Sequence, residues 1–219
     1  MARVRCVVFD LDYTLSHFKN GIESFFRIFT ERDVPESVVR DTYEKAVTSN
    51  NGFSFKVFLR LLGGPGAGSY QIENNLALCE GWLREELALY PDSLDALNLL
   101  SQRRVPTVVL TAGNQLFQQR KICVLALHPE HTFVVSPRHG SSKVIPLELF
   151  LRLYNKPIAF VDDMPQMLDQ VRDYGMVSQE VETYLMRRAD GPYVAKESTY
   201  PHTIVTGMNE LLEKIGVNR

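Results

Sequence analysis

The sequence predicts an α/β fold, in which helices flank a parallel β-sheet and an all-helical domain is inserted after the first strand. Short apolar runs rich in Val, Ile and Phe alternate with amphipathic stretches of helical length, which is typical of a parallel sheet with crossover helices. Polar or small residues follow each apolar run, as expected where a strand ends. About seventy residues between the first two runs contain no convincing strand, and a single crossover needs far fewer.

The core elements follow one another as strand–helix units. Predicted strands lie at 4–9, 105–110, 131–135 and 157–161. Predicted helices lie at 92–103, 114–126, 145–154 and 165–174. Asp92 and Asn114 are suitable N-caps, and Pro165 suits a first helical turn because its missing N–H would have no partner there.

The long segment after the first strand is expected to form a helical domain of its own. Its helical stretches are 20–33, 36–49, 53–62 and 70–89. We therefore predict a core made of residues 1–16 and 89–219 and a helical domain made of residues 17–88. Beyond residue 175 the pattern is weaker, with candidate strands at 181–187 and 203–205 and a candidate helix at 208–215.

Composition limits the class of protein and its partners. The chain of 219 residues has a net charge of −2, so neither nucleic acid nor an anionic membrane is an expected partner. No apolar run approaches the roughly 18 residues of a membrane span, and Asp10 interrupts the apolar stretch after Arg3 and Arg5 too soon for a signal peptide. The three cysteines lie far apart and form no CxxC pair, which favours a reducing, cytoplasmic location.

Chemically active side chains follow the predicted strands at the points where the strands end. Because sites in a parallel α/β sheet form at the carboxyl ends of the strands, these side chains are expected to meet in one crevice. They are Asp10 and Asp12 after the first strand, Thr111 and Ala112 after the second, Lys143 beyond the third, and Asp162 and Asp163 after the fourth.

This combination of groups indicates metal-assisted phosphoryl transfer. Several carboxylates brought together repel one another and protonate unless a cation joins them, and hard oxygen ligands favour Mg²⁺. Thr111, the backbone amides after it and Lys143 are donors for phosphate oxygens. One carboxylate can attack phosphorus, and a second, two residues along, can give a proton to the leaving group and later take one from water.

The sequence resembles the haloacid dehalogenase superfamily, whose four motifs occur here in that family's order. The first motif stands as Asp10-Leu11-Asp12-Tyr13-Thr14, in which the Thr hydroxyl is expected to help hold the loop. The second is VVLTAGN with Thr111, and the fourth is the acidic pair in AFVDDMPQ. Lys143 is the best match to the third motif, with Lys121 and Lys156 as rivals.

The resemblance covers roughly residues 1–175 and implies a Rossmann-like core with a helical type-1 cap where residues 17–88 lie. It implies that Asp10 is the nucleophile and that Asp12 is the general acid/base. It assigns the phosphoryl group to Thr111, Ala112 and Lys143, and a Mg²⁺ ion to Asp10, the backbone carbonyl of Asp12, Asp162 and Asp163. Which of the last two acids binds the metal directly stays open.

The leading hypothesis is a Mg²⁺-dependent phosphatase for a small phosphorylated metabolite, because a cap over the crevice would exclude macromolecules. One alternative is dehalogenase chemistry, in which Asp10 attacks carbon and a second acid in the first motif has no role. A phosphonate hydrolase or phosphomutase would use the same core, and a catalytically idle binding protein could share its fold. The oligomeric state stays open.

Overall fold

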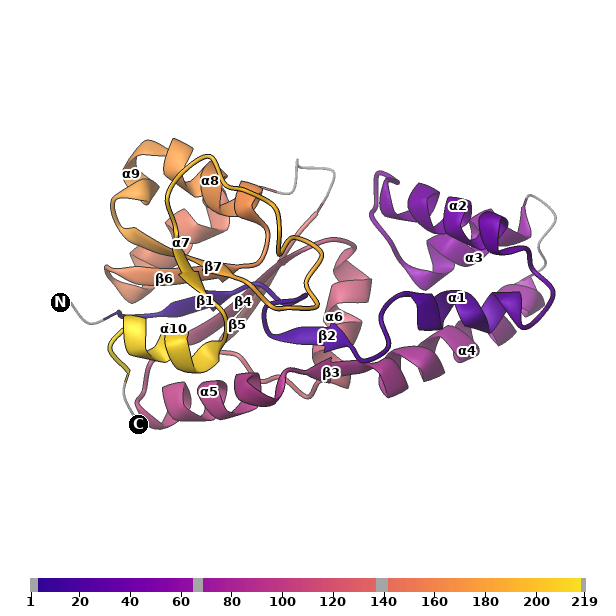
Figure 1. Cartoon of the computed structure of the whole chain (residues 1–219), viewed down its shortest axis with the longest axis horizontal. Coiled ribbons are helices and arrows are strands. Elements are labelled where there is room, and N and C mark those ends of the chain that lie inside the picture. The colour runs from indigo at the N-terminus through magenta and orange to yellow at the C-terminus, as the bar shows by residue number, and fades with distance from the viewer. Residues whose placement is uncertain (1–3, 65–68, 137–141, 218–219) are drawn as a thin grey trace.

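The computed structural model describes residues 4–64, 69–136 and 142–217, and its centre is a six-stranded parallel sheet (Figure 1). The strands are β1 (Val7–Phe9), β4 (Thr107–Ala112), β5 (His131–Val135), β6 (Ile158–Asp162), β7 (Val181–Met186) and β8 (Thr203–Val205). Their order across the sheet is β5-β4-β1-β6-β7-β8, so the chain moves outward from β1 in one direction and then in the other. This reversal beside β1 places a crevice at its carboxyl end.

Helices cover both faces of the sheet, which confirms the predicted α/β class. One face carries α5 (Pro91–Gln102), α6 (Gln115–Val124) and α10 (Met208–Lys214). The other carries α7 (Val144–Tyr154), α8 (Pro165–Asp173) and α9 (Gly175–Ser178). Successive residues of β1 point to opposite faces, so Val7 and Phe9 join the first apolar layer and Val8 joins the second. Burial on both faces is the reason that β1 is a continuous apolar run.

Four helices between β2 and β3 form a bundle beside the sheet (Figure 1). They are α1 (Glu23–Thr30), α2 (Glu36–Val47), α3 (Phe55–Gly63) and α4 (Ser69–Glu86). Their apolar core is built from aromatic rings around the fully buried Phe25, whose centroid lies 5.1 Å from that of Phe58 and 5.0 Å from that of Trp82. The helices agree with the expected content of the inserted segment, and the domain boundaries at 17 and 88 stay a prediction.

A short antiparallel ribbon connects the bundle to the core. It consists of β2 (Ser16–Phe18) and β3 (Leu87–Leu89), and Ser16 pairs with Leu89. The sequence patterns predict a helix up to residue 89 and no strand over 17–88, and both expectations are wrong here. Strands of three residues are too short to display an alternating pattern, and only their mutual pairing defines them.

The structure confirms one predicted helix cap and corrects another. Asn114 is the N-cap of α6, because its side-chain oxygen accepts a hydrogen bond from the Phe117 N–H at 3.1 Å. Asp92 lies within the first turn of α5, after Pro91, and does not cap it. Its carboxylate instead pairs with Arg188, far along the chain.

The last forty residues extend the sheet on the side of β6. β7 pairs with β6 and β8 pairs with β7, both in parallel, and α10 packs against α5. Between β7 and β8 the chain runs as a long loop, residues 187–202, which returns toward the site. Within the described parts of the chain, no helix combines the length and the apolar character needed to cross a membrane.

Candidate active site

The carboxyl ends of β1, β4 and β6 open into a cavity of about 440 Å³ that the helical bundle also lines. The cavity is lined by all the residues predicted for the site, namely Asp10, Asp12, Thr111, Ala112, Lys143, Asp162 and Asp163. β4 begins two residues later than expected, so Thr111 and Ala112 form the last two residues of the strand itself. The topology therefore brings together residues from 10 to 163, and their chemical roles stay predictions.

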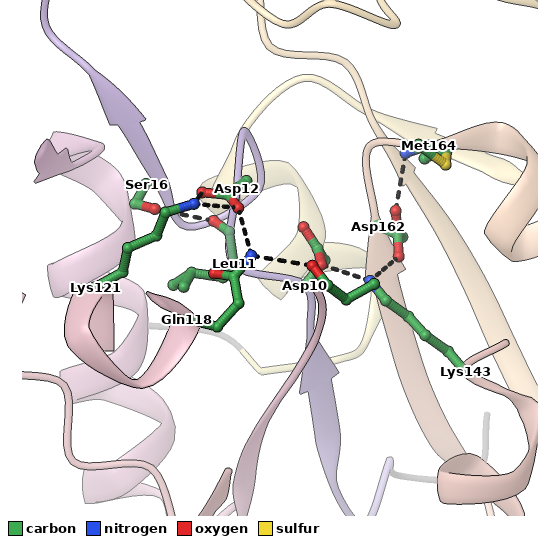
Figure 2. A network of polar contacts seen from close by, with 10 residues as sticks. Asp10, Leu11, Asp12, Ser16, Gln118, Lys121, Lys143, Asp162 and Met164 are labelled. Carbon is green, nitrogen blue, oxygen red and sulfur yellow. Dashed lines mark hydrogen bonds and ion pairs between the residues drawn. The ribbon is translucent and has the colours of Figure 1, made fainter. Parts of the chain in front are cut away.

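Lys143, which lines the cavity, lies between the carboxylates of Asp10 and Asp162 (Figure 2). Its Nζ is 2.5 Å from Asp10 Oδ1 and 2.7 Å from Asp162 Oδ2. Only 2 % of Lys143 and 1 % of Asp162 are exposed. Burial by itself would lower the pKa of Lys143, but the two carboxylates raise it above its ordinary value, so the ammonium group is charged.

Asp10, Asp162 and Asp163 form a buried acidic cluster in which one carboxylate oxygen of each lies within 4.8 Å of the others. Burial, together with the neighbouring acids, raises the pKa of Asp10 to about 7 and that of Asp163 to about 9. Asp162 uses both oxygens, since Lys143 donates to one and the Met164 N–H donates to the other at 2.9 Å.

Asp163 has a buried oxygen, Oδ2, with no hydrogen-bond partner among the described residues. Such an oxygen is costly unless something binds it. An unpartnered carboxylate oxygen beside two further acids fits a divalent cation that prefers oxygen ligands, and Mg²⁺ is such a cation. Asp10, Asp162 and Asp163 are therefore the residues that could hold the metal.

The second carboxylate of the first motif, Asp12, is held by a separate group of residues (Figure 2). Lys121 Nζ lies 2.9 Å from Asp12 Oδ1 and 2.7 Å from Oδ2, and only 4 % of Lys121 is exposed. Gln118 Nε2 donates to Asp12 Oδ2 at 3.3 Å and to the Ala112 carbonyl at 3.0 Å. Asp12 is thus oriented by two side chains of α6, outside the acidic cluster.

These positions distinguish the three candidate lysines of the third motif. Lys143 contacts Asp10, whereas Lys121 contacts Asp12 and Lys156 pairs with Glu180 at the surface. The geometry therefore favours Lys143 as the lysine of the acidic cluster.

The sequence patterns do not predict Gln118 as a site residue, and they offer Lys121 only as a rival to Lys143 for the third motif. The available signal is their spacing of three on the helix that directly follows the second strand, which places both on one face. Gly113 supports this arrangement, since its φ is +145° and a Cβ there would lie 2.8 Å from Gln118 Nε2. A larger residue at position 113 would displace the amide that holds Asp12.

The turn after β1 differs in one detail from the expectation. Tyr13 adopts a left-handed conformation with φ of 55°, and its N–H donates to the Ser16 carbonyl at 2.7 Å. The Ser16 hydroxyl donates to the Leu11 carbonyl at 3.1 Å. The Thr14 hydroxyl is buried without a hydrogen-bond partner among the described residues, so Ser16, not Thr14, holds this turn through its side chain.

Residues outside the four motifs complete the cavity. The inserted segment and its linker contribute Phe18, Ile22, Tyr43, Val47, Gly52, Phe53 and Trp82, and the loop 187–202 contributes Pro192 and Tyr193. In that loop, Arg187 donates to the carbonyls of Tyr193 and Lys196. No sequence pattern identifies these residues, because only the folded loop and bundle bring them to the cavity.

A larger hollow of about 650 Å³ lies elsewhere, at the amino-terminal end of β4. Its lining includes Leu97 of α5, Pro106 before β4 and Leu127 after α6. None of the predicted site residues lines it, and the acidic cluster lies in the smaller cavity. An active site is identified by its reactive side chains and not by its volume, so the smaller cavity is the candidate active site.

Comparisons with known proteins agree with this fold. The family model described as haloacid dehalogenase-like hydrolase matches residues 4–166. A haloacid dehalogenase-like hydrolase from Burkholderia xenovorans LB400 has a similar structure, with a TM-score of 0.68 and 21% identity over 97% of this chain and 96% of that one. No curated protein matches the sequence.

Two further solved structures are similar. An L-2-haloacid dehalogenase has a TM-score of 0.68 and 15% identity over 98% of this chain and 100% of its own. A protein described as a β-phosphoglucomutase from Thermotoga maritima has a TM-score of 0.57 and 15% identity over 97% of this chain and 99% of that one. At such identities the likeness shows the fold alone.

Proposed function

Because the chain belongs to the haloacid dehalogenase-like hydrolase family, we propose that this hydrolase is a Mg²⁺-dependent phosphatase for a small phosphate monoester. The observation that carries the proposal is that the two carboxylates of one motif have different surroundings. Asp10 lies in the acidic cluster beside Lys143, and Asp12 is held outside that cluster by Lys121. Phosphate ester hydrolysis needs both a nucleophile and a proton-transfer group.

In the first step, Asp10 attacks phosphorus, and the bond from phosphorus to the leaving oxygen breaks. The product is an aspartyl phosphate on Asp10. A Mg²⁺ ion held by Asp10, Asp162 and Asp163 would supply the positive charge that keeps these acids ionised and neutralises the phosphoryl group. Lys143 and Thr111 line the same part of the cavity and are placed to donate to phosphoryl oxygens.

Asp12 gives a proton to the leaving oxygen in the first step. In the second step it takes a proton from water as the water attacks phosphorus, and Asp10 is released as a carboxylate. Gln118 and Lys121 hold the Asp12 carboxylate in one orientation. A fixed orientation reduces the entropy that must be lost to reach the reactive geometry.

The helical bundle limits what can reach these groups. Its residues line the same cavity as the acidic cluster, and the Asn114 side chain donates to the Asn51 carbonyl at 3.1 Å between the sheet and the bundle. We therefore propose a small substrate and neither nucleic acid nor a membrane as a partner. A cytoplasmic location stays part of the proposal.

Dehalogenation is the second candidate, because some structurally similar proteins are described as L-2-haloacid dehalogenases. Displacement of halide by Asp10 has no use for a second acid, yet Asp12 is present and held by two side chains.

The test is hydrolysis of para-nitrophenyl phosphate, with Mg²⁺ and with a chelator, by the wild type and by Asp10→Asn. Asp95→Asn is the matched control, since it makes the same chemical change at an exposed position on α5. We expect metal-dependent turnover that is lost in Asp10→Asn and kept in Asp95→Asn. Chloride release from 2-chloropropionate, without phosphate release from any ester, would replace this proposal with dehalogenation.

A further inference from the structure

Five aromatic rings line the same cavity as the acidic cluster, and we call them the aromatic wall. They are Phe18, Tyr43, Phe53, Trp82 and Phe117. Four come from the inserted segment and its linker and one from α6, so the wall spans the bundle and the core. The charged residues of the described lining, which we call the charged floor, are Asp10, Asp12, Lys121, Lys143, Asp162 and Asp163.

The rings of the wall support one another. Phe18 stacks on Trp82 with centroids 4.8 Å apart, and Phe53 meets Phe117 edge-on at 5.1 Å. The Tyr43 ring lies 5.1 Å from that of Phe53. Rings held in this way form a preorganised surface, and aromatic rings interact best with other flat apolar groups.

The wall carries no charge, and the indole N–H of its tryptophan already has a hydrogen-bond partner. Trp82 Nε1 donates to the Ser24 hydroxyl of α1 at 2.8 Å, which leaves no free donor on that ring. Burial, with smaller contributions from Tyr13 and Asp12, raises the pKa of Tyr43 to about 12, so its phenol stays neutral near pH 7.

The cations of the floor are also engaged. Lys121 pairs with Asp12 while its Nζ lies 4.8 Å from the Phe117 centroid, and Lys143 pairs with Asp10 and Asp162. The inserted segment contributes no charged side chain to the described lining. A second anionic group, carried by the leaving group against the wall, would have no unpaired cation beside it among the described residues of the lining, which is costly.

We infer that the leaving group of the substrate is uncharged and aromatic, and that its ring lies against the aromatic wall while its phosphate lies on the charged floor. This inference rests on the proposed phosphatase function. It excludes phosphate esters whose alcohol carries a carboxylate, and it disfavours polyhydroxylated alcohols, because the wall has few groups to bond their hydroxyls.

Two matched pairs of substrates test the inference. Phenyl phosphate is compared with para-carboxyphenyl phosphate, which differs by one negative charge. Benzyl phosphate is compared with glycerol 3-phosphate, since both are esters of alkyl alcohols. We expect kcat/KM to be at least about tenfold higher for the neutral aromatic member of each pair. Equal values within both pairs would overturn the inference.

A substitution at the cavity edge tests the role of charge directly. Val47 lies on α2, lines the cavity and is 44 % exposed, so Val47→Lys adds a cation without disturbing the core. It should raise the kcat/KM of para-carboxyphenyl phosphate relative to phenyl phosphate by up to about fivefold. Val38→Lys is the control, because Val38 is equally exposed on the same helix and does not line the cavity.

The results separate this inference from the proposed function. If no ester is hydrolysed more rapidly by the wild type than by Asp10→Asn, the phosphatase proposal fails. If Asp10-dependent hydrolysis is present but both pairs are cleaved equally and Val47→Lys changes no ratio, only the inferred leaving group is wrong.

Discussion

Substitution of Asp92 tests how the C-terminal segment is attached to the rest of the core. Asp92 Oδ2 and Oδ1 accept hydrogen bonds from Arg188 at 2.8 and 2.9 Å, and Oδ2 also accepts one from the Met208 N–H at 2.8 Å. Arg188 is 8 % exposed, and its guanidinium group lies 4.1 Å from the Tyr90 ring centroid. One carboxylate thus joins α5, the loop after β7 and the start of α10.

Removing this charge should be costly because Arg188 stays buried. Loss of one partner of a buried ion pair costs about 3–5 kcal/mol, and Asp92, whose side chain is 25 % exposed, should fall at the lower end. Asp92→Asn is therefore expected to lower the free energy of unfolding by about 3 kcal/mol. Asp92→Ala also removes the acceptor of the Met208 N–H and should cost about 1 kcal/mol more.

The assay is thermal unfolding followed by circular dichroism. At about 2–4 °C per kcal/mol for a chain of this size, Asp92→Asn should lower Tm by about 6–12 °C. Glu148→Gln is the control, because Glu148 pairs with Arg152 at 2.6 Å on the exposed side of α7 and should change Tm by about 2 °C at most.

The pH dependence has a definite sign. Burial by itself would raise the pKa of Asp92, but Arg188 and the Met208 N–H lower it below its ordinary value. The carboxylate therefore contributes its stability above the unfolded pKa of about 3.9 and loses it as the pH falls through the lower folded value. The difference in Tm between the wild type and Asp92→Asn should become smaller below about pH 4. If Asp92→Asn lowers Tm at pH 7 by no more than the control Glu148→Gln does, the reasoning is refuted.

Three further predictions concern the site and the bundle. Lys121→Met should lower kcat for para-nitrophenyl phosphate by about 10²-fold because Asp12 loses its orientation, whereas an unchanged kcat would show that Lys121 has no positioning role. Mg²⁺ should raise the Tm of the wild type more than that of Asp163→Asn, and equal shifts would place the metal elsewhere. Phe25→Ala should lower the free energy of unfolding by about 3–5 kcal/mol in urea titrations, and a cost below about 1 kcal/mol would contradict the described bundle core.

Local patterns in the sequence were sufficient for the strands of the core sheet and for its helices except α9, a single turn over Gly175–Ser178 that no pattern predicts. β1 is an apolar run because both of its faces are buried, and this signal is contained in a few neighbouring residues. The same holds for the N-cap Asn114, whose partner lies three residues away. The ribbon of β2 and β3 was missed, because its strands are defined by a partner about seventy residues away in sequence.

The sequence by itself determined the α/β class, the helical insertion and the residues at the strand ends. The physical reason is that apolar periodicity and strand-end chemistry are local, and that parallel strands bring their carboxyl ends to one edge. Asp10, Thr111, Lys143 and Asp162 could therefore be predicted as neighbours before any distance was known.

Only the tertiary structure decided which charged groups pair and what surrounds them. Lys143 pairs with Asp10 and Lys121 pairs with Asp12 because of the distances between their helices and strands. The spacing of residues in the sequence does not predict such distances. The aromatic wall and the Asp92–Arg188 pair likewise join segments from distant parts of the chain. The inferred specificity rests on these long-range contacts, because they set which charged groups of the described lining are already paired.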